Sequence, residues 1–214
     1  MDGFSLPFVS VQRDLGVHID CNLKFSDHCQ KISGIASSIC FRIRRCFLSK
    51  EPNFLFRIFK TYVRPILEHD SPAWSPSLKR DVLKVEKPQR TFTKFLPGMN
   101  ELSYLQRLHK LNEETLLVRR IKCDLILAYK ILHGYVDGLN DLLVLDNNGR
   151  TRGHGWKLKH QPFRVNGRRN FFGVRVTRFW NLLPPEIVEA SNLLVFKTLI
   201  RKLTFSDINA QYFD

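Results

Sequence analysis

The residues of this chain that could do chemistry are mostly basic and aromatic, and many of them fall in one tract. Between Gly149 and Pro185 the chain contains no Asp or Glu. The cations of this tract are Arg150, Arg152, Lys157, Lys159, Arg164, Arg168, Arg169, Arg175 and Arg178. Lysine and arginine neutralise phosphates, and arginine planes can stack on bases. The tract therefore predicts contact with nucleic acid phosphates.

Aromatic rings are interleaved with these cations. The rings are Trp156, Phe163, Phe171, Phe172, Phe179 and Trp180. Such rings either stack on bases or anchor a hydrophobic core. For Phe171, Phe172, Phe179 and Trp180 we favour the core, and for the cations we favour phosphate contact.

The charge of the whole chain points to the same class of partner. The 34 Lys and Arg exceed the 20 Asp and Glu, which gives a formal net charge of +14. Folding does not require such an excess, and a polyanionic partner explains it because each neutralised phosphate releases counterions. RNA, an RNA–DNA hybrid or DNA fits best, and an acidic membrane surface is the weaker alternative. A second basic group is expected on a helix at Lys84, Lys87, Arg90 and Lys94.

Catalytic and metal sites find little support. Asp-Asp, Asp-x-Asp and Glu-x-x-His spacings that could hold Mg²⁺, a Gly-rich phosphate loop and a His-Glu-x-x-His motif are all absent from the sequence. A zinc site from Cys21, His28, Cys29 and His69 has suitable ligand types, but its spacing matches no closed zinc module. We expect no metal, no cofactor and no catalytic residue in this chain.

The cysteines and the hydropathy pattern indicate the cellular compartment in which the protein works. The five cysteines include no CxxC pair, and residues 1–10 carry no signal-peptide pattern. We expect reduced thiols in an intracellular protein, either nuclear or cytoplasmic. The longest uncharged apolar stretch, from Ile32 to Phe41, is shorter than the roughly 20 residues that a membrane helix needs. No membrane span is expected.

The elements that position these residues are predicted to be mainly helical. Phe8 to Val11 and Leu15 to Asp20 alternate apolar and polar residues around a polar break at residues 12–14, which indicates a short hairpin. From Ser26, predicted as an N-cap, apolar residues recur every three or four positions up to Phe47, as in an amphipathic helix.

Further helices follow from the same periodicity. They are expected from Pro52 with a break at Pro65, over Leu78 to Phe95 with an interruption at Pro88, over Ser103 to Lys110, over Glu113 to His133 with Gly134 as a cap, and over Ser191 to Leu203. Residues 70–76 are predicted as a loop held by a packed Trp74. The expected fold is thus mainly α, with a helical body, a short N-terminal β-hairpin and a basic, less regular C-terminal region.

Several ordered blocks of the sequence resemble a known family. The first blocks are DLGVHID at residues 14–20, LKFSDH at 23–28, YVRPILE at 62–68 and SPAWSP at 71–76. Later blocks lie at residues 83–94, 102–111, 124–134, 151–154, 168–172 and 175–184. Together they resemble the C-terminal part of reverse transcriptases from non-LTR retrotransposons, with the jockey-like and CR1-like lineages as the nearest match.

The resemblance implies a division of the chain. Residues 1–24 would be the end of the palm with a primer-grip-like hairpin, residues 25–148 a helical thumb-like domain, and residues 149–214 a basic and aromatic region with a terminal helix. The chain would bind template and primer as part of an RNA-directed DNA polymerase. Pro88 departs from the family's pattern, because it replaces an apolar residue in a helix that the family keeps continuous.

The same resemblance bears on activity. The family's catalytic aspartates, in a Phe/Tyr-Ala-Asp-Asp box, would lie before Met1, and no residue here matches them. The chain is therefore expected not to be an enzyme on its own, and a palm-containing polypeptide is a candidate partner. Two alternatives stay open: a non-enzymatic helical interaction module, and a non-functional remnant of a mobile element.

Overall fold

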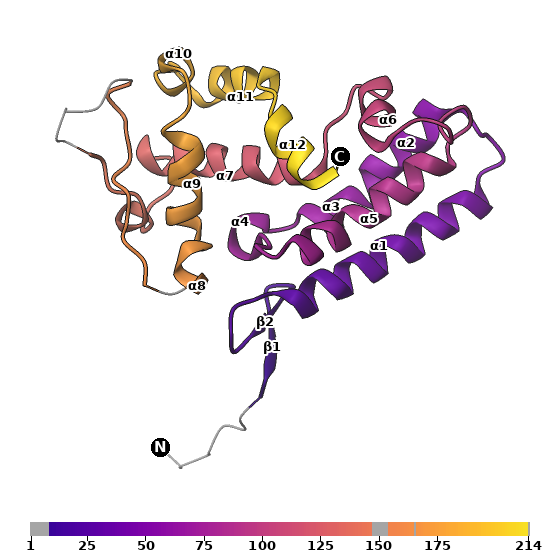
Figure 1. The fold of residues 1–214 in the computed structure, drawn as a ribbon, viewed down its shortest axis with the longest axis horizontal. Coiled ribbons are helices and arrows are strands. Elements are labelled where there is room, and N and C mark those ends of the chain that lie inside the picture. The colour runs from indigo at the N-terminus through magenta and orange to yellow at the C-terminus, as the bar shows by residue number, and fades with distance from the viewer. Residues whose placement is uncertain (1–8, 147–153, 165, 214) are drawn as a thin grey trace.

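The computed structural model describes residues 9–146, 154–164 and 166–213. Arg150 and Arg152 lie outside the described residues. The protein is mainly helical with an antiparallel hairpin near its N-terminus, which confirms the predicted fold class (Figure 1). The elements are β1 (Val11–Asp14), β2 (Val17–Asp20), α1 (Ser26–Cys46), α2 (Pro52–Tyr62), α3 (Arg64–Glu68), α4 (Ser71–Trp74), α5 (Lys79–Phe95), α6 (Tyr104–Lys110), α7 (Leu116–Leu132), the 3-10 turn η1 (Asn140–Leu142), α8 (Asn166–Arg169), α9 (Phe172–Trp180), α10 (Pro185–Val188), α11 (Leu193–Lys202) and α12 (Ser206–Phe213).

The hairpin begins later in the sequence than predicted. β1 pairs with β2 so that Val11 faces Asp20, and residues 12–14, predicted as a break, belong to β1. The turn is Leu15-Gly16, and both residues have positive φ, of 44° and 92°. Positive φ at both turn residues matches the right-handed twist of the two strands. Most residues of β1 are exposed, so its polar side chains at residues 12–14 stay in contact with water.

Helix α1 confirms the predicted amphipathic helix, but its cap differs. Phe25, with a φ of 56°, is the N-cap, and Ser26 is already helical. The hydroxyl of Ser26 donates to the Asp81 carboxylate at 2.6 Å, which ties the start of α1 to α5. The prediction of Ser26 as N-cap was wrong because this hydroxyl has a partner on another helix.

Helix α5 runs without interruption through Pro88, against the prediction of a break. Pro88 lies buried in the helix interior, where it cannot donate to the carbonyl of Lys84. The Ser33 hydroxyl of α1 donates to that carbonyl instead, at 2.7 Å. The packing of α1 against α5 thus replaces the hydrogen bond that proline removes.

Prolines lie in the first turns of the short helices α3 and α4. The chain leaves α2 at Val63, and Pro65 lies in the first turn of α3, as the predicted break requires. The predicted loop at residues 70–76 instead contains the one-turn helix α4. Trp74 is fully buried, as predicted, and its indole N–H donates to the His69 carbonyl at 2.6 Å.

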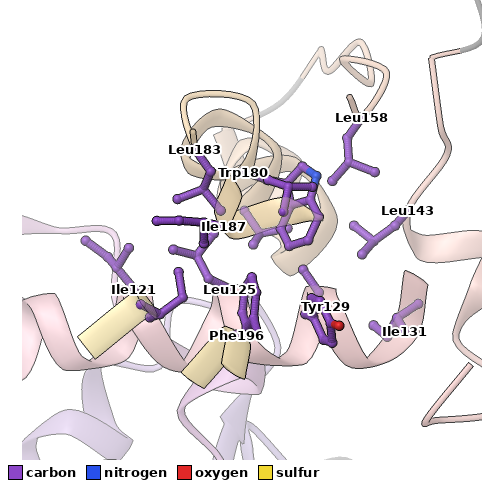
Figure 2. Packing of buried hydrophobic residues seen from close by; sticks show 14 of the residues in the cluster. Ile121, Leu125, Tyr129, Ile131, Leu143, Leu158, Trp180, Leu183, Ile187 and Phe196 are labelled. Atoms are coloured by element: carbon purple, nitrogen blue, oxygen red, sulfur yellow. The ribbon is translucent and has the colours of Figure 1, made fainter. Parts of the chain in front are cut away.

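Two clusters of buried apolar residues form the core. The first joins β2, α1, α2, α3, α4 and α5, with Phe59, Trp74 and Phe92 among its fully buried members. The second joins α7 to α9, α10 and α11 around Trp180. Figure 2 shows Trp180 and Ile187 packed over Leu125 and Tyr129 of α7. The boundary expected at residue 149 therefore does not separate two cores, because α7 shares one with the C-terminal helices.

The C-terminal region is more regular than expected. It contains α8 to α12, of which α11 matches the predicted terminal helix and α12 lies beyond it. Trp180 and Phe172 are buried core anchors, as predicted, and Phe179 packs against the same cluster. Phe171 is 43% exposed, so its prediction as a core anchor was wrong. Over the described residues, no helix has both the length and the apolar content to cross a membrane.

Candidate nucleic-acid interface

The basic group on α5 forms one exposed face of that helix. Lys87, Arg90 and Lys94 are exposed and follow one another at steps of three and four residues, which places them on one side. Lys84 is half-buried, and its Nζ lies 3.5 Å from Oδ1 of Asp81. Lys84 therefore has an acidic partner inside the protein, and among the described residues the other three cations of this group do not.

The opposite side of α5 explains why these cations face outward. Val82, Val85 and Phe92 are buried apolar residues on that side. Glu86 is fully buried and accepts from the backbone N–H groups of Leu116 and Leu117 at 2.9 and 3.2 Å. A carboxylate at the first turn of α7 satisfies donors that have no helical partner. The core thus fixes the rotation of α5.

Beside this face lies a hollow that the sequence did not reveal. It has a volume of about 500 Å³ and includes Arg90 and Lys94 of α5, Arg44 of α1 and Arg107 of α6. Its lining contains no Asp or Glu. Arg44 and Arg107 were missed because they lie 46 and 17 positions from Arg90, on other predicted helices. Periodicity places cations on a helix face but does not say which helices meet.

The second basic group lies on and around α8 and α9. Lys159, Arg164, Arg168, Arg169 and Arg178 are exposed. Lys157 is half-buried, and its carbonyl accepts from the backbone of Asp146 at 2.8 Å. Arg168 donates to Oε1 of Gln161 at 3.3 Å, and its guanidinium lies 5.7 Å from the ring centroid of Phe171. Of this group, Arg178 lies on α9, a helix of the second core cluster, whereas α5 contributes residues to both clusters.

Arg175 differs from the other predicted phosphate ligands. Its Nε and Nη2 donate to the two carboxylate oxygens of Asp124, at 2.8 and 2.9 Å. It also donates to the carbonyls of Asn170 and Pro72. The side chain of Asp124 is 5% exposed and that of Arg175 is 16% exposed. The contacts with Asp124 and Pro72 tie α9 to α7 and α4, so the structure uses Arg175 internally.

The thiols of this chain do not form a reactive or metal-binding site. Burial raises the pKa of Cys29 to about 12, so it is a poor nucleophile and a poor metal ligand at neutral pH. Cys21, another member of the zinc set considered from the sequence, is exposed. In the described part of the chain, no three His, Cys, Asp or Glu side chains come together as metal ligands.

Buried carboxylates likewise have partners within the fold. Burial raises the pKa of Glu86, which also accepts from the Tyr104 hydroxyl. Burial raises the pKa of Asp124 against the opposing effect of Arg175. These acids hold helices together, and the arrangement supports binding of anions by surface cations better than chemistry by carboxylates.

The chain is similar to a nematode protein over part of its length. No model of a known protein family matches the chain, and no solved structure matches it. The chain is 27% identical over 124 residues to the uncharacterized protein B0403.1 of Caenorhabditis elegans. This alignment covers 56% of the chain and 63% of that relative.

Proposed function

We propose that this protein binds nucleic acid through phosphate contacts, as the thumb and downstream part of a non-LTR retrotransposon reverse transcriptase. RNA, an RNA–DNA hybrid or DNA would be the ligand. Polymerisation would need a palm-containing polypeptide, because no Phe/Tyr-Ala-Asp-Asp box occurs in the sequence. The chain would contribute binding and positioning of the strands.

One observation carries this proposal. Among the described residues, seven of the cations expected to contact phosphate have no acidic partner: Lys87, Arg90, Lys94, Lys159, Arg168, Arg169 and Arg178. All seven are exposed. Cations that a fold needs are normally paired or buried along their stems, whereas phosphate ligands must be reachable and unpaired.

The order of the sequence blocks supports the family assignment within the proposal. YVRPILE ends α2 and forms α3, and SPAWSP forms α4 around the buried Trp74. The block at residues 124–134 supplies Asp124, and the block at 175–184 supplies its partner Arg175. These blocks therefore coincide with contacts that join distant parts of the chain, as expected if they belong to one inherited fold.

Binding and primer extension, measured together, test the proposal. Purified protein would be titrated into a labelled RNA–DNA hybrid, and extension of the same primer would be followed with Mg²⁺ and deoxynucleotides. The proposal predicts binding without extension by this chain alone. Absence of binding at low salt would contradict it, and extension by the chain alone would contradict the assignment of a palm-less fragment.

A further inference from the structure

The hollow beside α5 has the composition of an anion site. Four cations line it, from three different helices: Arg44 on α1, Arg90 and Lys94 on α5, and Arg107 on α6. Thr91 adds a hydroxyl to the same lining. Among the described residues, no carboxylate belongs to this lining, so the four positive charges share one hollow without a counter-charge in it. Like charges repel unless an anion lies between them.

Aromatic rings lie against all three guanidinium groups of the hollow, including Arg107, whose Cζ is 5.6 Å from the ring centroid of Tyr104. Cζ of Arg44 lies 3.8 Å from the ring centroid of Phe95, and Cζ of Arg90 lies 5.4 Å from that of Tyr104. A guanidinium that faces a ring keeps its in-plane N–H donors available. Because Tyr104 is 4% exposed and bonded to Glu86, the surface against which Arg90 lies is rigid. The donors are therefore partly ordered before any ligand binds.

Arg107 adds a charge that the protein itself leaves uncompensated. It is 6% exposed, and its side chain donates to neutral acceptors alone: the Thr93 hydroxyl at 3.2 Å and the carbonyls of Leu102 and Arg90 at 2.6 and 3.3 Å. Burial lowers the pKa of Arg107, although an arginine remains protonated in proteins. A buried charge without a counter-charge is costly, and an anion in the hollow would offset that cost.

The acid nearest in sequence does not fill this role. Glu101 accepts from the side-chain amide of Asn100 at 3.0 Å, and Asn100 borders the hollow. Glu101 itself is exposed and is not part of the lining. Among the described residues, Glu101 makes no salt bridge with any of the four cations, so it does not serve as their counter-charge.

We propose that this hollow binds a phosphoryl group of a nucleic acid backbone, held by Arg44, Arg90 and Lys94. Arginine forks match the oxygens of a phosphate with paired hydrogen bonds, and Lys94 adds a point charge. Arg107 acts at longer range, because its own donors are occupied. This inference rests on the proposed function and assigns one backbone phosphate to a defined place.

Competition between RNA and inorganic phosphate tests the site directly. Binding of labelled oligouridylate would be measured while sodium phosphate or sodium chloride is added to the same ionic strength. The hollow variant is Arg90→Gln with Lys94→Gln. The control is Arg201→Gln with Lys202→Gln, which removes the same charge from two exposed cations at the end of α11.

In the wild type and the control, phosphate is expected to displace RNA more strongly than chloride does. In the hollow variant the two salts should act alike, and its RNA affinity should be about tenfold below that of the control, as expected for loss of charged hydrogen bonds. A hollow variant that binds RNA as tightly as the control would overturn the inference and leave the proposed function standing.

A thermal measurement distinguishes whether phosphate binds in the hollow from whether that site holds a nucleic acid backbone. Inorganic phosphate, compared with chloride at equal ionic strength, should raise the Tm of the wild type and the control but not that of the hollow variant, because a ligand stabilises the state that binds it. Equal Tm in both salts for the wild type would overturn the site. A phosphate-dependent rise in Tm without any competition against RNA would overturn its assignment to a nucleic acid backbone.

Discussion

The hydroxyl of Ser33 on α1 donates a 2.7 Å hydrogen bond to the carbonyl of Lys84, which would accept from residue 88 in a regular helix. Pro88 has no N–H to offer there. Both Ser33 and Pro88 are buried, so no water would reach this carbonyl if the hydroxyl were absent. A side chain of α1 thus supplies the hydrogen bond that the backbone of α5 lacks.

Replacing Ser33 with Ala should therefore lower the free energy of unfolding. We expect a loss of about 1 to 3 kcal/mol, the cost of leaving a buried acceptor unsatisfied. Urea denaturation would measure it, with Ser38→Ala at an exposed position of α1 as the control. In a Pro88→Ala background the backbone N–H returns, so the same substitution should cost less. An equal loss in both backgrounds would contradict the compensation.

The pair of Asp124 and Arg175 predicts a difference between two neighbouring arginines. Arg175→Ala should lower the free energy of unfolding by about 3 to 5 kcal/mol, because it leaves the carboxylate of Asp124 buried and unpaired. Arg178→Ala, one turn further along α9 and exposed, should change it little. Thermal or urea unfolding of the two variants would show whether Arg175 has this internal role.

The arginines of α8 predict a change in binding rather than in stability. Arg168 and Arg169 are exposed, and replacing both with Ala should weaken binding to all nucleic acid sequences. The slope of log affinity against log salt should flatten by up to about two phosphate contacts. Unfolding should be nearly unaffected. An unchanged slope would mean that these side chains face away from the ligand.

His28 predicts how stability depends on pH. Burial, together with the charges of His18, His69 and Lys31, lowers the pKa of His28 from 6.5 to about 4. Its Nδ1 accepts from the backbone N–H of His18 at 3.3 Å, which requires the neutral ring. Between these two pKa values the unfolded chain binds a proton that the folded protein does not.

The contribution of His28 to stability is therefore fully present above pH 6.5 and is lost as the pH falls toward about 4. The slope should reach at most about 1.4 kcal/mol per pH unit. Urea denaturation between pH 4 and 7 would measure it, and His28→Gln should reduce the slope while His109→Gln, at an exposed position, should not. Equal slopes in the wild type and His28→Gln would rule out this linkage.

Periodicity was enough to predict the helices because their buried stripes follow the helical repeat. Residues 26–46 and 116–132 both fall within predicted helices, and the capping box of Ser103 and Gln106 marks the start of α6. The continuity of α5 could not be predicted, because the hydroxyl that compensates for Pro88 comes from a residue 55 positions earlier. Rules based on neighbouring residues predict that Pro88 removes a hydrogen-bond donor, but they cannot predict that Ser33 on another helix replaces it.

In the candidate site, too, some features follow from helical periodicity and others depend on tertiary contacts. The exposed cations of α5 follow from helical spacing, since Val82 and Val85 fix the buried side. The internal use of Arg175 depends on Asp124, which lies 51 residues away. Likewise, Arg44 joins Arg90 at one hollow through packing of α1 on α5. Composition identifies a class of partner, whereas tertiary contacts decide which cations remain available to it.

The most direct test of the central claim is the salt dependence of binding to a labelled RNA–DNA hybrid. If exposed, unpaired cations contact backbone phosphates, log affinity should fall linearly with log salt, with a slope of about −0.9 for each phosphate contacted in a duplex. With seven such cations, a steep slope of several units is predicted. A slope near zero would contradict phosphate binding by this surface.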